Sequence, residues 1–311
     1  MPNATSASPQ PPPPHADAAA RRRRWALVLL WLVPAIWSSN YLIARVSGAH
    51  VPPHVLASGR WGLVCVVLAV LSARAIAADP RRFMAEWRHS LVLGALGMWI
   101  CGAWVYLAGH TTTATNIGLI YAAAPVGIAI GGAHLLGERL GAAQRIAMPL
   151  ALAGVLFVVA RGDPASLLDV RFVAGDLWIV GATLSWIAYS LLLQHWKTRL
   201  SATERLCAMA AGGLVVMAPF TAWELATLAQ PLAARAWQLI ALAGLLPGLV
   251  SYLAYAFLQR ELGVARAGLV LYLAPVYGAG LAWWILGEPP QWYHGVGALL
   301  ILPSIHIATR R

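Results

Sequence analysis

Aromatic and amide side chains stand in the middle of long uncharged stretches of this chain. Trp37, Asn40 and Tyr41 lie in the stretch AIWSSNY, and Trp186 and Tyr189 lie in LSWIAYS. A polar group that faces lipid is costly, and a mid-membrane amide without partners is especially so. We therefore expect these side chains to face one shared cavity that binds a small polar molecule. The same reasoning adds four candidate substrate-binding residues, Trp104, Tyr121, Tyr255 and Tyr272.

Packing is the competing interpretation of each of these rings. Tryptophan near the end of an apolar stretch is typical of the aromatic belt at the membrane–water interface. Such positions are Trp25, Trp87, Trp178, Trp196, Trp223, Trp237 and Trp292. Trp37 and Trp186 fall in mid-stretch instead, and for this pair cavity lining and packing both stay open.

Five further residues have types suited to a gate or to a structural role: Arg60, Pro125, Glu138, Pro275 and Glu288. A proline in a helix removes a backbone hydrogen bond and frees a carbonyl, which can bind a ligand or permit a kink. Each glutamate follows a glycine that is expected to cap a helix, so we expect the carboxylate to pair with a loop arginine. Arg60 either extends to the outer interface or pairs with an anionic substrate or an outer-gate carboxylate.

Reactive constellations are missing from the sequence. It has no GxSxG elbow, no intramembrane aspartate pair and no HExxH zinc motif, so we expect neither an enzyme nor a bound metal or cofactor. The three cysteines lie in apolar stretches without metal-ligand spacing. No Asp or Glu lies in the middle of an apolar stretch, which argues against a proton-coupled organic-cation pump and favours neutral or zwitterionic cargo.

The elements that position these residues are membrane-spanning helices. The chain has 311 residues, of which 60% are hydrophobic and 11% charged, and its mean hydropathy is +0.68. A soluble domain carries about 25% charged residues, and a helix needs about 20 apolar residues to cross a bilayer. We predict an all-α membrane protein with ten spans, at 25–46, 54–73, 89–109, 114–136, 141–160, 175–196, 204–224, 236–258, 265–286 and 291–308.

Basic residues orient these spans. If the N-terminus is cytoplasmic, most of the 22 Lys and Arg residues fall in cytoplasmic segments, whereas only Arg161, Arg171 and Arg235 fall in outer loops. We therefore expect both termini in the cytoplasm, after an even number of crossings. The net charge of +11 reflects this topology rather than nucleic-acid binding. Residues 1–24 are rich in Pro and Ala and are predicted to be a disordered cytoplasmic segment.

The sequence also contains an internal repeat. Residues 118–138 and 268–288 align at an offset of 150, with GLIYAAAPVGIAIGGAHLLGE above GLVLYLAPVYGAGLAWWILGE. Trp37 and Trp186 correspond at a similar offset. Each half then holds five spans, at 25–161 and 173–308. Because five is odd, the second half enters from the opposite side and the two repeats are inverted, a design that recurs in secondary transporters.

These features resemble the EamA-domain members of the drug/metabolite transporter superfamily. The resemblance rests on both APV…LGE segments, on WSSNY, on Arg60 and on the pair Gly175–Asp176, and it covers nearly all of the chain from Trp25 to His306. It implies a ten-helix fold with a central cavity between spans 1, 3, 4, 6, 8 and 9. Pro289 and Pro290 follow the second LGE where the first repeat has Arg139 and Leu140, so the resemblance predicts no symmetric gate role for these loops.

The function that this resemblance implies is secondary transport across a bacterial inner membrane. Export of an amino acid or an amino-acid derivative by alternating access is the leading hypothesis. The alternatives are a multidrug or other metabolite permease, and a non-transporting membrane receptor or assembly subunit. The expected partners are a small-molecule substrate and the lipid bilayer, with no nucleic acid, and the protein is expected to be a monomer or a homodimer.

Overall fold

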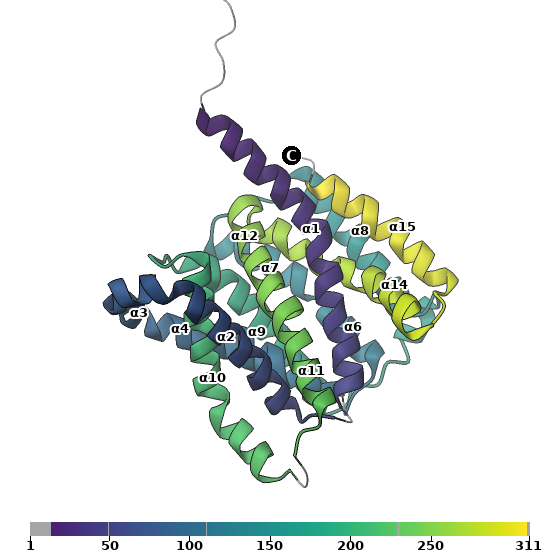
Figure 1. Ribbon diagram of the computed structural model, residues 1–311. Coiled ribbons are helices and arrows are strands. Elements are labelled where there is room, and N and C mark those ends of the chain that lie inside the picture. Colours follow the sequence, from purple (N-terminus) through teal and green to yellow (C-terminus); the bar gives the residue numbers. More distant parts are fainter. Residues whose placement is uncertain (1–13, 49, 110, 229–230, 310–311) are drawn as a thin grey trace, which may run out of the picture.

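The computed structural model describes residues 14–48, 50–109, 111–228 and 231–309, and these residues form helices and connecting loops without a strand (Figure 1). The elements of the first half are α1 (Pro14–Ser47), α2 (Pro53–Ala78), α3 (Pro80–Ala85), α4 (Trp87–Gly94), η1 (Ala95–Trp104), α5 (Val105–Gly109), α6 (Ala114–Tyr121), α7 (Ala124–Leu135) and α8 (Ala142–Val159).

A short 3₁₀ turn, η2 (Pro164–Leu167), lies in the connection to the second half. The elements that follow are α9 (Asp176–His195), α10 (Ala202–Ala226), α11 (Ala234–Ala243), η3 (Gly244–Val250), α12 (Ser251–Leu262), α13 (Val264–Gly268), η4 (Leu269–Leu273), α14 (Ala274–Leu286) and α15 (Trp292–Thr309).

Every predicted span coincides with one helix or with a run of consecutive helices. Nine of these spans, counted over the described residues, are long and apolar enough to cross a membrane. The tenth, α15, is 18 residues long and less apolar because it contains His294 and His306; it packs along α8. The prediction of an all-α membrane protein with two inverted five-helix repeats is confirmed.

The N-terminal segment differs from its prediction. Disorder was expected through residue 24, but α1 begins at Pro14, so the prediction is wrong for residues 14–24. The run DAAARRRR consists mainly of strong helix formers, and the membrane helix that follows it provides a ready nucleus. Residues 1–13 lie outside the described part of the chain.

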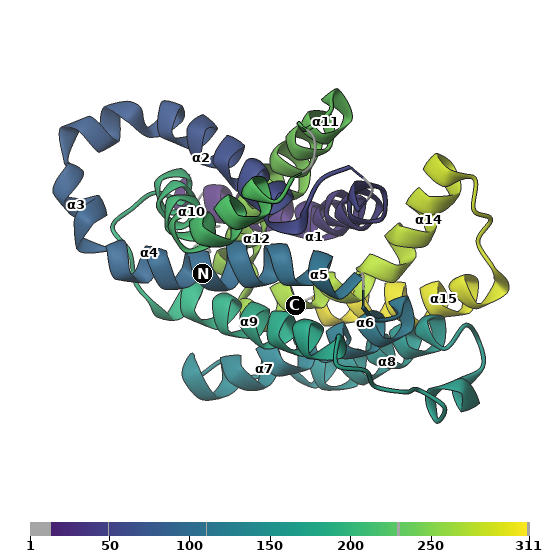
Figure 2. The same cartoon turned by 90° about the horizontal axis from the view of Figure 1, so that it is seen from below.

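Contacts between helices follow the repeat. The first helix of each half packs on helices of the other half. Helix α1 of the first half packs on α12 and α14, and its counterpart in the second half, α9, packs on η1 and α7. Two pairs of repeat-related helices lie at opposite ends of the bundle, α2 with α10 and α8 with α15 (Figure 2). The pairing follows from a two-fold relation between the halves, and it leaves α1 and α9 as central helices.

Irregular turns occur at matching places in the two repeats. The third and eighth spans each contain a π-helical segment, η1 and η3, and the fourth and ninth spans are each interrupted just before the sequence APV. Pro125 and Pro275 then occupy the first turn of the new helix, where a missing N–H costs little. Short π-helical segments are frequent at functional sites. We therefore look for the functional site among the helices around these interruptions.

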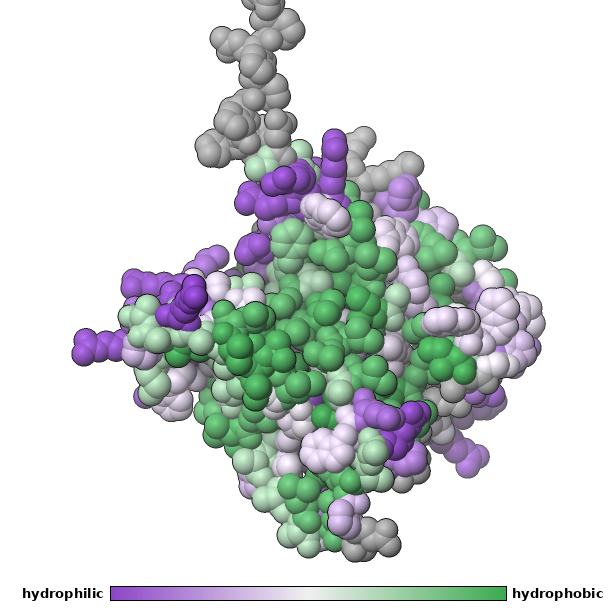
Figure 3. Space-filling view, viewed as in Figure 1, coloured by the Kyte–Doolittle hydropathy of each residue, from purple (hydrophilic) through white to green (hydrophobic). Residues whose placement is uncertain are grey.

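Hydrophobic and hydrophilic side chains are separated on the surface, as in other membrane proteins. Hydrophobic residues cover the middle of the face in Figure 3, and hydrophilic residues gather at its upper edge, where α1 begins, and around α3. The start of α1 and the end of α15 lie at the same end of the bundle (Figure 1). Six of the seven tryptophans expected in an aromatic belt are exposed: Trp25, Trp87, Trp178, Trp223, Trp237 and Trp292.

Candidate functional site

Five aromatic rings from three helices meet between the two repeats. We name them the central aromatic cluster: Trp37 of α1, Trp186 and Tyr189 of α9, and Tyr252 and Tyr255 of α12. The ring centroids of Trp37 and Trp186 are 5.3 Å apart at an interplanar angle of 80°, an edge-to-face contact. Tyr255 lies 5.2 Å from Trp37 and 5.3 Å from Trp186. Four of the predicted residues are therefore brought together at the repeat interface.

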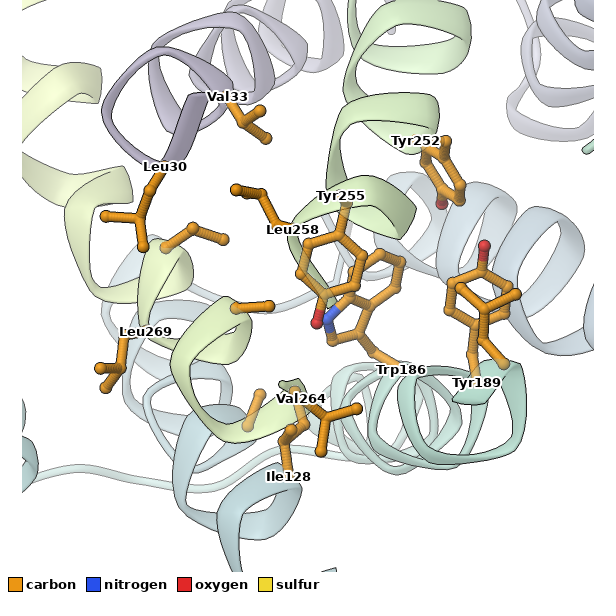
Figure 4. Close-up of a cluster of buried hydrophobic side chains, with 14 of the residues drawn as sticks. Leu30, Val33, Ile128, Trp186, Tyr189, Tyr252, Tyr255, Leu258, Val264 and Leu269 are labelled. Atoms are coloured by element: carbon orange, nitrogen blue, oxygen red, sulfur yellow. The ribbon is translucent and has the colours of Figure 1, made fainter. Parts of the chain in front are cut away.

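Hydrogen bonds fix the tyrosines of this cluster. The Tyr252 hydroxyl donates to the Gly97 carbonyl in η1 at 2.7 Å, and the hydroxyls of Tyr255 and Ser190 lie 3.1 Å apart. Figure 4 shows the Trp186 ring against that of Tyr255, with Tyr189 and Tyr252 beside them. Since the rings fill the space between α9 and α12, the cluster forms a packed aromatic wall.

A polar group adjoins this wall on the side of α2. The Tyr106 hydroxyl donates to Asn40 Oδ1 at 2.9 Å, and Arg60 Nη1 lies 3.3 Å from both of these oxygens. The Trp61 ring connects the group to the cluster, because its centroid is 4.8 Å from that of Tyr252. Asn40 thus has partners, as its mid-span position requires.

The break in the ninth span also faces α1. The Ser38 hydroxyl lies 2.7 Å from the Pro34 carbonyl and 3.3 Å from that of Ala274, which immediately precedes Pro275. Tyr272, just before this break, is 1% exposed, and its hydroxyl has no hydrogen-bond partner among the described residues. Tyr121 is half-buried at the equivalent break before Pro125.

One predicted site residue lies elsewhere. Trp104 belongs to a separate group, with its ring centroid 5.9 Å from Trp99 and 5.1 Å from Trp178, near the start of α9. Trp178 is exposed, so this group extends to the surface of the bundle. The side chain of Tyr41 lies outside the described part of the chain.

The two LGE motifs end α7 and α14 in the same way. Gly137 and Gly287 have φ angles of 68° and 69°, the left-handed conformation that glycine adopts without strain. The following N–H groups, of Glu138 and Glu288, return to carbonyls six residues earlier, at 3.1 and 3.3 Å. Both glycines are therefore helix caps, as the sequence predicts.

Glu138 makes a contact that the sequence did not indicate. Its carboxylate accepts hydrogen bonds from the backbone N–H groups of Val264, at 2.8 Å, and Ala265, at 3.1 Å, at the start of α13. A loop arginine is the predicted partner, and Arg266 does lie within electrostatic reach of this carboxylate. The hydrogen-bond donors that the structure adds are the free N–H groups of a helix N-terminus. Gly263 allows the approach: its φ is 86°, and a Cβ there would lie 2.9 Å from Glu138 Oε1.

Glu288 occupies a different setting at the other end of the repeats. It is exposed and borders a surface cleft between α8, α14 and α15, together with Arg161, Tyr293 and His294. The two glutamates thus share a helix-capping motif but have different surroundings.

Sequence reasoning missed a carboxylate at the start of α2. Glu224 of α10 accepts hydrogen bonds from the backbone N–H groups of His54 and Val55, at 2.8 and 2.9 Å, and its other oxygen lies 2.7 Å from His54 Nδ1. Both side chains are buried. The available signal was a histidine directly after two prolines, which marks a helix start without a side-chain cap.

Helices that cross a membrane, an inverted repeat and a polar group at the repeat interface together define a membrane transport protein. A family model described as the EamA-like transporter family matches this chain twice, at residues 24–160 and 173–310. The chain belongs to this family. It is accordingly a transporter and not an enzyme, and the resemblance noted in its sequence is confirmed.

Several known proteins are similar over nearly the whole chain. An "Uncharacterized transporter" of Archaeoglobus fulgidus is 23% identical over 91% of this chain and 97% of its own. The "Uncharacterized transporter YyaM" of Bacillus subtilis is 22% identical over 87% and 89%. A "Probable terminal-alkyne amino-acid exporter" of Streptantibioticus cattleyicolor is 28% identical over 92% and 93%.

The fold also has a counterpart among solved structures. A chain described only as "Crystal structure of protein" superimposes with a TM-score of 0.73 and 20% sequence identity, covering 92% of this chain and 96% of the other. At this identity the likeness supports the fold alone.

Proposed function

We propose that this transporter exports an amino acid or an amino-acid derivative across a bacterial inner membrane by alternating access. The observation that carries the proposal is the contact of Trp37 with Trp186, at 5.3 Å. These residues occupy corresponding positions in the two repeats, so a ligand that binds against both rings touches both halves. The amino-acid exporter among the relatives supports the substrate class.

The chemistry of the site agrees with an amphipathic substrate of this size. Aromatic faces bind apolar side chains and attract ammonium groups, and the polar group around Asn40 offers hydrogen bonds at one edge of the wall. The residues that we propose to bind substrate are therefore Trp37, Asn40, Tyr41, Trp186, Tyr189, Tyr255 and Tyr272, together with Trp104 and Tyr121 at the margins.

The distribution of charge supports an orientation. Arg21, Arg22, Arg23 and Arg24 at the start of α1 are exposed and lie at the end of the bundle that also holds the end of α15 (Figure 1). Since basic residues concentrate on the cytoplasmic side, we place both termini there.

In this orientation Glu138 closes the cytoplasmic end. Its bonds to the N-terminus of α13 join the fourth span of one repeat to the ninth span of the other. Opening that end requires their loss, because the two spans line opposite sides of the interface. We propose Glu138 as the inner gate and place Glu288, its repeat counterpart, at the outer end, with Pro125 and Pro275 at the bends about which the two spans move.

The test is counterflow in proteoliposomes that contain the purified full-length protein. Liposomes loaded with one unlabelled amino acid are diluted into the same labelled amino acid, and each of the common amino acids is tried in turn. We expect saturable accumulation for at least one of them. Trp37→Ala should reduce its initial rate by at least tenfold, because the variant removes the ring shared by both repeats.

The matched control is Trp237→Ala, which removes an exposed ring at the start of α11. This variant should transport at the wild-type rate. Absence of counterflow for every amino acid, with folded protein in the liposomes, would overturn the substrate class and direct the same assay to other metabolites. Equal rates for Trp37→Ala and the wild type would overturn the location of the site.

A further inference from the structure

Arg60 is a buried cation inside the membrane-spanning bundle. It lies two turns inside α2, about 10 Å from the start of that helix at Pro53. Its relative exposure is 4%, so the side chain does not extend to the interface. Among the described residues, no carboxylate forms an ion pair with it. A buried charge without a counter-ion costs several kcal/mol, and an ionisable residue in this position points to a ligand.

Within the described part of the chain, the contacts of Arg60 are with neutral groups only: two oxygens and the face of the Trp61 ring. Nη1 donates to two neutral oxygens, those of Asn40 and Tyr106, at 3.3 Å in each case, which is beyond the usual length. Arg60 Nε is buried and has no partner in the described part of the chain. The Tyr106 hydroxyl gives its own proton to Asn40 Oδ1, so this pair supplies dipoles but no negative charge.

A second unused donor lies beside it. The Trp61 indole Nε1 is buried and unpaired among the described residues, and it faces η1, where a Cβ on Gly102 would lie 3.5 Å away. The Arg60 guanidinium carbon is 4.8 Å from the Trp61 ring centroid. Two neighbouring buried donors without an acceptor form a site that only an acceptor can complete, and the positive charge favours an anion.

The position of these donors relates them to the aromatic wall. Trp61 contacts Tyr252 of the central aromatic cluster at 4.8 Å between centroids. The polar residues come from α1, α2 and the third span, and η3 closes the remaining side, where a Cβ on Gly248 would lie 3.7 Å from Arg60 Cγ. An anion held here therefore lies at the edge of the wall, between two π-helical segments.

We propose that Arg60 and Trp61, supported by Asn40 and Tyr106, form the subsite for the carboxylate of the transported substrate. The proposal rests on the proposed function and specifies it: the carboxylate is held beside α2, and the rest of the molecule lies on the aromatic cluster. The second repeat has Met209 and Ala210 at the positions that correspond to Arg60. A single cation serves a monocarboxylate rather than a dianion.

The experiment measures ligand binding to the full-length protein in lipid nanodiscs, by the shift of its thermal unfolding temperature with concentration. The probes are the common L-amino acids, their C-terminal amides, and the straight-chain carboxylates from acetate to hexanoate. We expect at least one amino acid to bind, and its amide to bind about 10- to 100-fold more weakly. Arg60→Gln should weaken binding of the acid by a similar factor and remove the preference for acid over amide.

Conservative variants and a control separate binding from folding. Arg60→Lys keeps the charge and should retain part of the preference, and Tyr106→Phe should reduce it less than Arg60→Gln. Arg235→Gln removes an exposed arginine near the start of α11 and should bind as the wild type does. If Arg60→Gln does not fold, the proposal is still tested by comparing the affinity of the wild type for an amino acid with its affinity for the amide of that amino acid.

The outcomes distinguish this subsite from the proposed function. Binding of simple carboxylates that depends on Arg60, without binding of any amino acid, would support the subsite and overturn the amino-acid assignment. Equal binding of an amino acid and its amide to the wild type would overturn the subsite and leave amino-acid transport standing. Absence of binding by every carboxylate probe to the folded wild type would also overturn the subsite.

Discussion

Glu138 and Val264 belong to different repeats and are joined by a hydrogen bond of 2.8 Å, from the Val264 backbone N–H to the Glu138 carboxylate. Ala265 donates to the other oxygen of the same carboxylate. A carboxylate at a helix N-terminus satisfies donors that have no partner within the helix and interacts favourably with its dipole. The end of the fourth span is thereby fastened to the beginning of the ninth.

Removing this carboxylate should free the start of α13. We expect Glu138→Ala to accelerate amide hydrogen exchange at Val264 and Ala265 by about 10- to 100-fold, the effect of losing hydrogen bonds to a charged group. Glu138→Gln, which keeps an acceptor but not the charge, should give a smaller acceleration. Exchange is measured by mass spectrometry on peptides that span the α12–α13 junction.

Glu261→Ala is the control, because it removes a nearby carboxylate whose contacts are with Arg22 and Arg260. It should leave the exchange of both amides unchanged. If Glu138→Ala also leaves it unchanged, the bonds do not hold α13, and Glu138 is not the inner gate.

A second carboxylate, Glu224, fastens the start of α2 to α10. It accepts hydrogen bonds from two backbone N–H groups and from the His54 ring. Glu224→Ala should therefore lower the free energy of unfolding by about 1–3 kcal/mol. His54→Ala removes one of the three contacts and should cost less. Thermal unfolding of the purified variants in detergent measures both effects, and a larger loss for His54→Ala would contradict this account.

The spans could be predicted from the sequence because their cause is local. A bilayer demands about 20 apolar residues wherever the chain crosses it, so hydropathy alone locates each helix. The repeat identified Trp37 and Trp186 as counterparts, and counterparts that lie in mid-span, close to the two-fold axis of inverted halves, come together, as these two rings do. Gly137 and Gly287 were recognisable as caps for a similarly local reason.

The direction of individual rings could not be predicted in this way. Trp104 was expected in the cavity and Tyr252 was not selected, yet the structure gives the central place to Tyr252. Trp104 is the last residue of the π-helical segment η1, and Tyr252 comes two residues after the end of η3. Such a segment has more residues per turn than an α-helix, so the face that follows it is rotated from the one that regular spacing predicts.

The partners of Glu138 and Glu224 lay beyond prediction for a different reason. Their acceptor oxygens bind backbone N–H groups, which every residue but proline possesses. No residue type marks such a partner, and only the fold selects it. Arg60 is recognisable as unusual from the sequence, but whether a carboxylate of the described residues pairs with it depends on contacts between three spans.

The orientation of the chain can be tested with reporter fusions. A green fluorescent protein fused after Arg311 should fluoresce in a bacterial cytoplasm, because both ends of the chain are proposed to lie there. Alkaline phosphatase fused after Pro290, in the loop between α14 and α15, should be active, because this enzyme requires the oxidising periplasm. The reverse pattern, a dark first fusion or an inactive second one, would contradict the inferred topology.

Gly94 allows the third and seventh spans to pack closely, because it brings the backbone of α4 against that of α10. A Cβ on Gly94 would lie 2.3 Å from the Gly213 backbone nitrogen and 2.4 Å from the Met209 carbonyl oxygen. Neither backbone atom can move aside alone, so Gly94→Ala must separate α4 from α10. Small residues at helix interfaces allow such approaches in membranes. We expect Gly94→Ala to destabilise the protein by about 1–3 kcal/mol.

Gly62 provides the matched control, because it also lies within a membrane-spanning helix and a Cβ there meets nothing within 4 Å. Gly62→Ala should be neutral or should stabilise the fold by up to about 1 kcal/mol, since glycine weakens a helix relative to alanine. Unfolding temperatures of the two variants in the same detergent give the comparison. If both variants match the wild type, α4 and α10 are free to move apart, and their contact does not help to hold the two repeats together.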